Sequence, residues 1–219
     1  MKTMSRTERS SRSASRRQLI KAGLFGAMGV AASAAVVPAV IAQPKNDDVA
    51  NDIKVLNNAL FYEHQAIWAY GFAAGKLTDS AVGKAVLAIA LANQADHKAH
   101  RDLLASVVRQ LGGMPVMSKT EYLKTVTPYI ERGEGNLDSD VNIAKLALSL
   151  EVDAAIAYGR EVAKLKNPDL ITAGASIGST EASHATVIRA AFQSLGVSLN
   201  VVPAAFVSKD TRDAWIIKV

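Results

Sequence analysis

The sequence carries two copies of a pattern whose residue types could bind metal ions. In each copy a glutamate stands seven residues before a tyrosine, and a later segment sets two potential ligands three residues apart. The chain has no cysteine, so any metal ligands must be His, Asp or Glu. The candidate ligands are Glu63, His97 and His100 in the first copy and Glu151, Glu181 and His184 in the second. The two copies together predict one metal site.

The spacing within each copy predicts that helices present these ligands. Residues three apart share one face of an α-helix, so His97 and His100 point to the same side, as do Glu181 and His184. Each pair is followed, twelve residues after its second member, by a glycine that stops the helix. A hairpin with one glutamate on its first helix and such a pair on its second is half of a dimetal four-helix bundle.

Apolar periodicity places the elements that must position the ligands. Four helices are predicted, at about 48–75, 79–111, 139–166 and 168–195. The connection between the second and third is long, contains one short helix, and could start the third helix at either end of the bundle. The C-terminal tail, with Phe206 and Trp215, is too apolar for a solvated linker. It is expected either to pack back along the bundle or to form a subunit contact.

The first 42 residues have the composition of an export signal. A polar, arginine-rich stretch is followed by an apolar segment and a small-residue cleavage site after Ala42. The pair Arg16-Arg17 and the residues after it resemble the twin-arginine export motif. That resemblance implies a domain at 43–219, delivered folded to the periplasm or another extracytoplasmic space without stable membrane association. The alternative is an uncleaved membrane anchor.

Charge is distributed unevenly between this leader and the rest of the chain. Seven of the 25 basic residues but only one of the 20 acidic residues lie within residues 1–42. The remaining 18 basic and 19 acidic side chains give a net charge of −1. The mature domain therefore offers no charge argument for binding nucleic acid.

Residues 48–196 resemble the ferritin-like superfamily in their four-helix pattern and ligand spacing. The resemblance implies an all-α ferritin-like four-helix bundle with one long crossover between helices two and three, followed here by the apolar tail. By position, Glu63 and Glu151 match the single-helix carboxylates, and Glu181 with His184 matches the full paired motif. It further implies one or two bound transition-metal ions, with iron or manganese expected. A homo-oligomer is a further expectation.

His97 departs from the family pattern, which has glutamate at this position. An imidazole cannot bridge two metals as a carboxylate can, so three carboxylates and three histidines favour zinc, copper, manganese or Fe(II) over a carboxylate-bridged diferric centre. Asp96 could restore the pattern, because it lies about 40° from His100 on the helical wheel, against about 60° for His97. The sequence leaves both alternatives open.

Other polar residues near the candidate ligands are not expected to bind metal themselves. His64 lies roughly 100° around the helix from Glu63, which predicts a rim or surface position. Asp153 is likewise off the ligand stripe. Tyr70 and Tyr158 stand two turns from their glutamates, and buried packing between helices is favoured over a role in electron transfer or in supporting the ligands.

These observations favour an exported metal-binding protein with oxidase-type or oxygen- or peroxide-handling chemistry, which would make it a ferroxidase-like oxidoreductase. The alternative is a non-catalytic envelope stress or interaction protein whose site is degenerate or holds structural zinc. Iron storage ranks last, because it needs a cage of many subunits whose contacts the sequence does not show.

Overall fold

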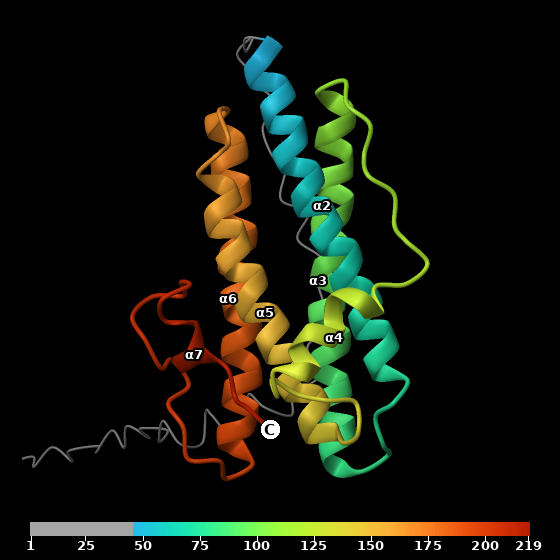
Figure 1. Cartoon of the computed structure of the whole chain (residues 1–219), viewed down its shortest axis with the longest axis vertical. Helices are drawn as coiled ribbons and strands as arrows, with labels where there is room; N and C mark the ends of the chain where they lie inside the picture. Colours follow the sequence, from blue (N-terminus) through green and yellow to red (C-terminus); the bar gives the residue numbers. More distant parts are fainter. Residues whose placement is uncertain (1–45) are drawn as a thin grey trace, which may run out of the picture. The chain divides into compact units, whose positions relative to one another are not determined.

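The computed structural model describes residues 46–219, and every regular element in that part of the chain is a helix (Figure 1). The predicted export signal at 1–42 lies outside the described residues. The helices are α2 (Asn46–Ala74), α3 (Ala81–Gln110), α4 (Leu123–Glu131), α5 (Asp140–Val162), α6 (Pro168–Ser194) and α7 (Arg212–Trp215). The predicted all-α fold is therefore confirmed.

The four long helices form two antiparallel hairpins, α2 with α3 and α5 with α6 (Figure 1). The connection from α3 to α5 runs back along the bundle and contains α4. Asn57 of α2 holds this crossover, since its side chain donates to Met114 O at 3.0 Å and accepts from Val116 N at 2.7 Å. Helix α5 consequently starts at the end of the bundle where α3 starts, which gives the single long crossover that was predicted.

Local sequence sets the ends of these helices. Ser80, Ser139 and Asn167 each precede a helix and accept a hydrogen bond from a backbone N–H in its first turn. The glycines that follow α3 and α6, Gly112 and Gly196, adopt φ values of 82° and 90°, a conformation that glycine tolerates best. The helix-stop signals of the two repeat copies thus act in the same way.

The predicted bounds agree with the structure to within about two residues except at the end of α5, which stops at Val162 rather than 166. The carboxylate of Asp52, at the start of α2, explains the difference. It accepts hydrogen bonds from Lys166 N at 2.8 Å and Asn167 N at 3.0 Å. The turn between α5 and α6 is therefore fastened to α2, and these residues cannot continue the helix.

The C-terminal tail packs back along the bundle, which is one of the two alternatives left by the sequence. Trp215 and Ile216 are buried against α5 and α6 in one of the two hydrophobic clusters of the core. Arg189 of α6 is also buried and donates to the tail carbonyls of Asn200 at 2.8 Å and Trp215 at 2.5 Å. Tail and bundle therefore form one packed unit.

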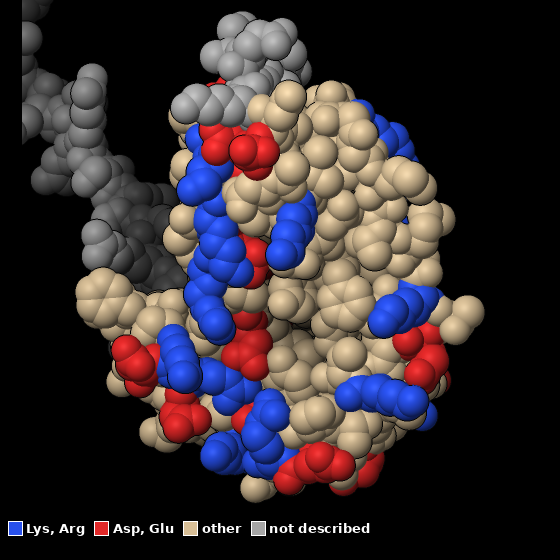
Figure 2. Space-filling view, turned by 45° about the horizontal axis from the view of Figure 1, so that its top comes forward, with Lys and Arg blue, Asp and Glu red and all other residues tan. Residues whose placement is uncertain are grey.

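The surface carries charges of both signs. On the face shown in Figure 2, lysine and arginine side chains lie close to aspartate and glutamate side chains, beside a broad uncharged area. This mixture agrees with the near-zero net charge expected after residue 42. None of the helices in the described part of the chain combines the length and apolar character that a membrane span requires.

Candidate metal centre

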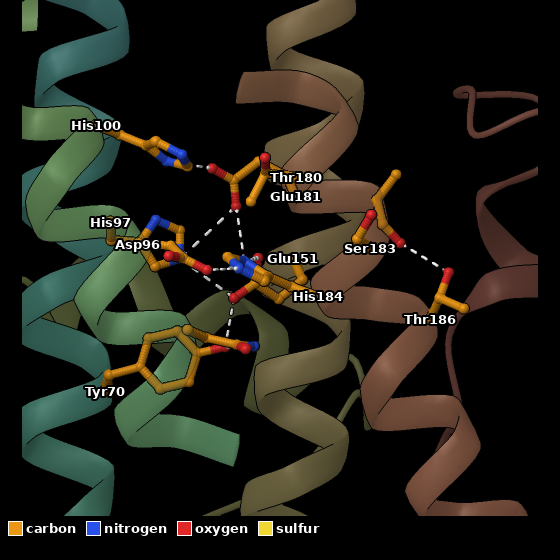
Figure 3. A network of polar contacts seen from close by, with 12 residues as sticks. Tyr70, Asp96, His97, His100, Glu151, Thr180, Glu181, Ser183, His184 and Thr186 are labelled. Atoms are coloured by element: carbon orange, nitrogen blue, oxygen red, sulfur yellow. Dashed lines mark hydrogen bonds and ion pairs between the residues drawn. The ribbon is translucent and has the colours of Figure 1, made fainter. Parts of the chain in front are cut away.

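The fold brings the six predicted ligands together at the centre of the bundle. Figure 3 labels five of them, all but Glu63. The six come from all four long helices and are Glu63, His97, His100, Glu151, Glu181 and His184, called the carboxylate–histidine cluster below. Five of them expose 5% of their surface or less, and His100 is half-buried. Three buried carboxylates in one place need positive charge close by, from protons or from metal ions.

The cluster contains two overlapping groups with the arrangement of a metal site. The first comprises Glu63, His97, His100 and Glu181, and the second comprises His97, Glu151, Glu181 and His184. Within each group one ligand atom per residue lies within 4.8 Å of all the others. The only residues common to both groups are His97 and Glu181, which are the two positions where the repeat copies differ.

The contacts of His97 and Glu181 explain why both groups include them. His97 Nδ1 lies 2.8 Å from Glu63 and its Nε2 lies 3.2 Å from Glu151, so the ring faces a carboxylate on each side. Glu181 Oε1 lies 3.1 Å from His100, and Oε2 lies 3.2 Å from His184. A carboxylate with one oxygen toward each group suits a bridging position, whereas a neutral imidazole has one nitrogen free to coordinate.

One pair of buried atoms in the cluster is close together without forming a well-oriented hydrogen bond. His100 Nδ1 and Glu181 Oε1 face each other at 3.1 Å. Both atoms are buried, yet neither has a hydrogen bond of acceptable geometry within the described structure. Buried polar atoms without partners are costly. These two atoms are paired by charge but not by a well-formed hydrogen bond, and both could serve as ligands of one cation.

The cluster also shifts the ionisation of its own histidines. Burial lowers the pKa of each imidazole, but the facing glutamates outweigh it. They raise the pKa of His100 to about 9 and that of His184 to about 10, and they hold the pKa of His97 well above its ordinary value. Three protonated imidazoles can thus balance three carboxylates in the metal-free protein.

Tyr70 and Tyr158 are buried between helices, as the sequence favoured, and they also contact the cluster directly, which was the alternative. Each donates its hydroxyl to the glutamate of the other repeat copy: Tyr70 to Glu151 and Tyr158 to Glu63. The exchange arises because α2 and α5 run antiparallel, which places a residue two turns from one glutamate beside the other. Asn93 completes the arrangement by donating to the Tyr70 hydroxyl at 2.9 Å.

The structure distinguishes the roles of His97 and Asp96. The ring of His97 lies inside the cluster, whereas the side chain of Asp96 is 57% exposed and belongs to neither ligand group. Asp96 instead lies 3.1 Å from Nε2 of His184, on the side of the ring away from the glutamates. It is thus placed to orient His184 and fix its tautomer.

The two residues interpreted as peripheral do lie outside the cluster. His64 contacts the crossover, with Nε2 3.1 Å from Val116 O. Asp153 accepts from Arg212 of the tail at 2.6 Å. Of the residues that complete the centre, the two tyrosines were visible in the repeat itself, but their partners depend on helix direction, which local spacing does not encode.

Comparison with known proteins agrees with this geometry. The sequence profile of the ferritin-like domain matches residues 51–194, which covers the four long helices and the whole cluster. The chain belongs to the ferritin-like domain family. A crystal structure of a conserved hypothetical protein from Mycobacterium tuberculosis resembles this ferritin-like domain protein with a TM-score of 0.51 at 21% sequence identity. The match covers 73% of this chain and 99% of the other, and it supports the fold alone. No curated protein gave a significant match.

Proposed function

We propose that this ferritin-like protein binds one or two transition-metal ions in the carboxylate–histidine cluster and uses them in oxidase-type chemistry on oxygen or peroxide. The observation that carries the proposal is the pair of ligand groups sharing His97 and Glu181. Such an arrangement lets one buried site hold two ions with ligands from four helices. Iron or manganese is expected from the family, and the three imidazoles also suit zinc or copper.

The residues present fit a metal. Glu63, His100 and Glu181 would hold one ion and Glu151, Glu181 and His184 a second, with His97 free to join either. The unpartnered atoms of His100 and Glu181 would then gain a ligand interaction. When bound, a redox-active ion would supply the electron transfer to oxygen or peroxide.

The protein's own residues would prepare this site. Tyr70 and Tyr158 hold the carboxylates of Glu151 and Glu63 in place from outside the ligand groups, and Asp96 does the same for His184. Burial of five of the six ligands keeps most bulk water away from the centre. Orientation and exclusion of water are the protein's contribution, and the redox step depends on the ion.

Elemental analysis of the purified protein tests metal binding. We expect a transition metal at one or two equivalents, and we expect its loss in Glu181→Ala, because this variant removes a ligand from both groups. Asp102→Ala is the matched control, since it removes a carboxylate that is 71% exposed on α3. Protein without bound metal, and with no difference between the two variants, would contradict the proposal.

A second measurement tests the oxidase chemistry separately. Aerobic oxidation of added Fe(II) should be faster with the wild-type protein than in buffer, and Glu181→Ala should remove the difference. Full metal occupancy with no acceleration would instead support the non-catalytic alternative, a structural-zinc or interaction protein that keeps the same bundle.

Export is a further part of the proposal and rests on the sequence of the leader. Cell fractionation of the full chain should recover it outside the cytoplasm, and Arg16→Lys combined with Arg17→Lys should retain it inside. A double variant that is exported as efficiently as the wild type would remove the twin-arginine assignment while leaving the metal site untouched.

A further inference from the structure

A cavity of about 370 Å³ lies between α2, α4, α5 and the C-terminal tail. Its volume is within the range of small-molecule sites, about 300–1,000 Å³. Five aromatic side chains line it, namely Tyr62, Trp68, Tyr70, Phe72 and Tyr129. The buried residues Tyr70, His97 and Glu151 form its deep end, whereas Tyr62 and Phe72 are exposed and mark its mouth. The cavity therefore leads from solvent to the carboxylate–histidine cluster.

Basic side chains also line this cavity at its exposed side. Arg160 of α5 and Lys209 of the tail are both exposed, and neither forms an ion pair with any residue between 46 and 219. A third cation, Arg212, forms ion pairs with Asp153 and with Glu134, each at 2.6 Å, so its charge is already balanced. The mouth consequently carries an excess of positive charge, and most of the lining between it and the polar deep end is apolar or aromatic.

We propose that this cavity binds a small organic acid with an aromatic body. One face of the Trp68 ring is stacked on Phe72 at 4.8 Å, and one face of the Tyr129 ring is covered by Arg132 at 4.7 Å. An aromatic ligand would meet the remaining faces or edges of these rings, and aromatic pairs gain from edge-to-face and offset stacking in addition to burial. Arg160 and Lys209 are the groups placed to receive the carboxylate through charge-assisted hydrogen bonds. The bound molecule would lie beside Glu151 and His97, at the edge of the proposed metal site.

Binding of 1-naphthoate to the purified, metal-free protein tests the proposal by isothermal titration calorimetry. We expect one binding site per chain. The neutral analogue 1-naphthalenemethanol should bind roughly tenfold more weakly, because it lacks the charge that Arg160 and Lys209 recognise. Absence of naphthoate binding, or equal affinity for the acid and the alcohol, would overturn the proposal.

Two variants with matched controls locate the site. Ala154→Phe places a ring inside the cavity and should abolish binding, whereas Ala85→Phe adds the same ring to an exposed position outside it. Arg160→Gln should weaken naphthoate roughly tenfold, whereas Lys54→Gln removes an exposed charge elsewhere and should not.

Arg160 is exposed, so its variant tests the proposal even if Ala154→Phe fails to fold. Unchanged affinity in Arg160→Gln together with unchanged affinity in a folded Ala154→Phe would show that binding occurs elsewhere. Because every measurement uses metal-free protein, its outcome is independent of whether the cluster binds metal.

Discussion

His97 and Glu181 occupy equivalent positions in the two repeat copies, and they are the residues through which the copies share one site. Glu181 offers an oxygen to each ligand group, whereas His97 offers a nitrogen to each of two glutamates. The substitution of imidazole for carboxylate removes one negative charge and adds one group that can be protonated. The metal-free cluster can therefore be electrically balanced by protonated imidazoles alone, whereas four carboxylates with two histidines would also need protonated carboxyl groups.

His97→Glu should reverse this balance. It creates a fourth buried carboxylate facing Glu63 and Glu151, so we expect the free energy of unfolding of the metal-free protein to fall by roughly 3 kcal/mol or more. His97→Gln removes the positive charge without adding a negative one. Its free energy of unfolding should therefore lie between those of His97→Glu and the wild type. Urea denaturation with a chelator present measures the free energy of unfolding of all three proteins. A His97→Glu protein as stable as the wild type would show that charge balance in the cluster does not determine the stability of the metal-free protein.

The C-terminal tail is held to the bundle by charges that the helical pattern did not reveal. Glu134, in the turn after α4, is buried and accepts from Arg212 of α7 at 2.6 Å and from Arg132 at 2.8 Å. Burial raises the pKa of Glu134, but the two guanidinium groups outweigh it and lower that pKa from 4.5 to about 2. The ionised carboxylate is therefore part of what anchors α7.

This shift predicts how the anchor depends on pH. Because the folded pKa of Glu134 lies below its unfolded value, its contribution is complete above pH 4.5 and is lost as pH falls toward 2. Glu134→Gln should lower the free energy of unfolding at pH 7 by up to about 3 kcal/mol. Denaturation series should show that the difference from wild type shrinks between pH 4.5 and 2, and a difference that stays constant over this range would contradict the assignment.

Two glycines test the packing of the helices themselves. A Cβ on Gly83, in the first turn of α3, would overlap the Thr78 carbonyl oxygen and lie 2.8 Å from Asp140 Oδ2 at the start of α5. Gly83→Ala should therefore cost about 2–3 kcal/mol. Gly159, inside α5, has no atom within 4 Å of such a Cβ, so Gly159→Ala should stabilise by roughly 0.5–1 kcal/mol. Thermal denaturation of both variants measures the contrast, and two shifts of the same sign would contradict it.

The sequence predicted the helices and the six candidate ligands because both depend on spacing within a helix. The sequence did not decide, in contrast, at which end of the bundle the crossover returns to start α5. Its course depends on contacts such as that between Asn57 and Val116, 59 residues apart. The early end of α5 depends in the same way on Asp52, far away in the chain. Periodicity carries no information about such long-range polar contacts, and this is also why the partners of the tyrosines were missed.

At the scale of the whole molecule, the two hairpins meet with approximate twofold symmetry at the cluster. Tyr70 and Tyr158 cross from one hairpin to the glutamate of the other, so each half positions a ligand that the other half carries. Neither ligand group can form within one hairpin, because each draws residues from both. Metal binding is accordingly expected to link the hairpins to each other.

Hydrogen exchange measured with and without Zn(II) tests this linkage, since zinc has no redox chemistry of its own to complicate the comparison. We expect protection to increase in α2, α3, α5 and α6 together, with a total stabilisation of about 2.7 kcal/mol when free zinc is 100 times its dissociation constant. His184→Ala should lose most of this effect, whereas His64→Ala, which lies outside the cluster, should keep it. Protection confined to α6, or equal in the two variants, would mean that zinc binds without joining the two halves.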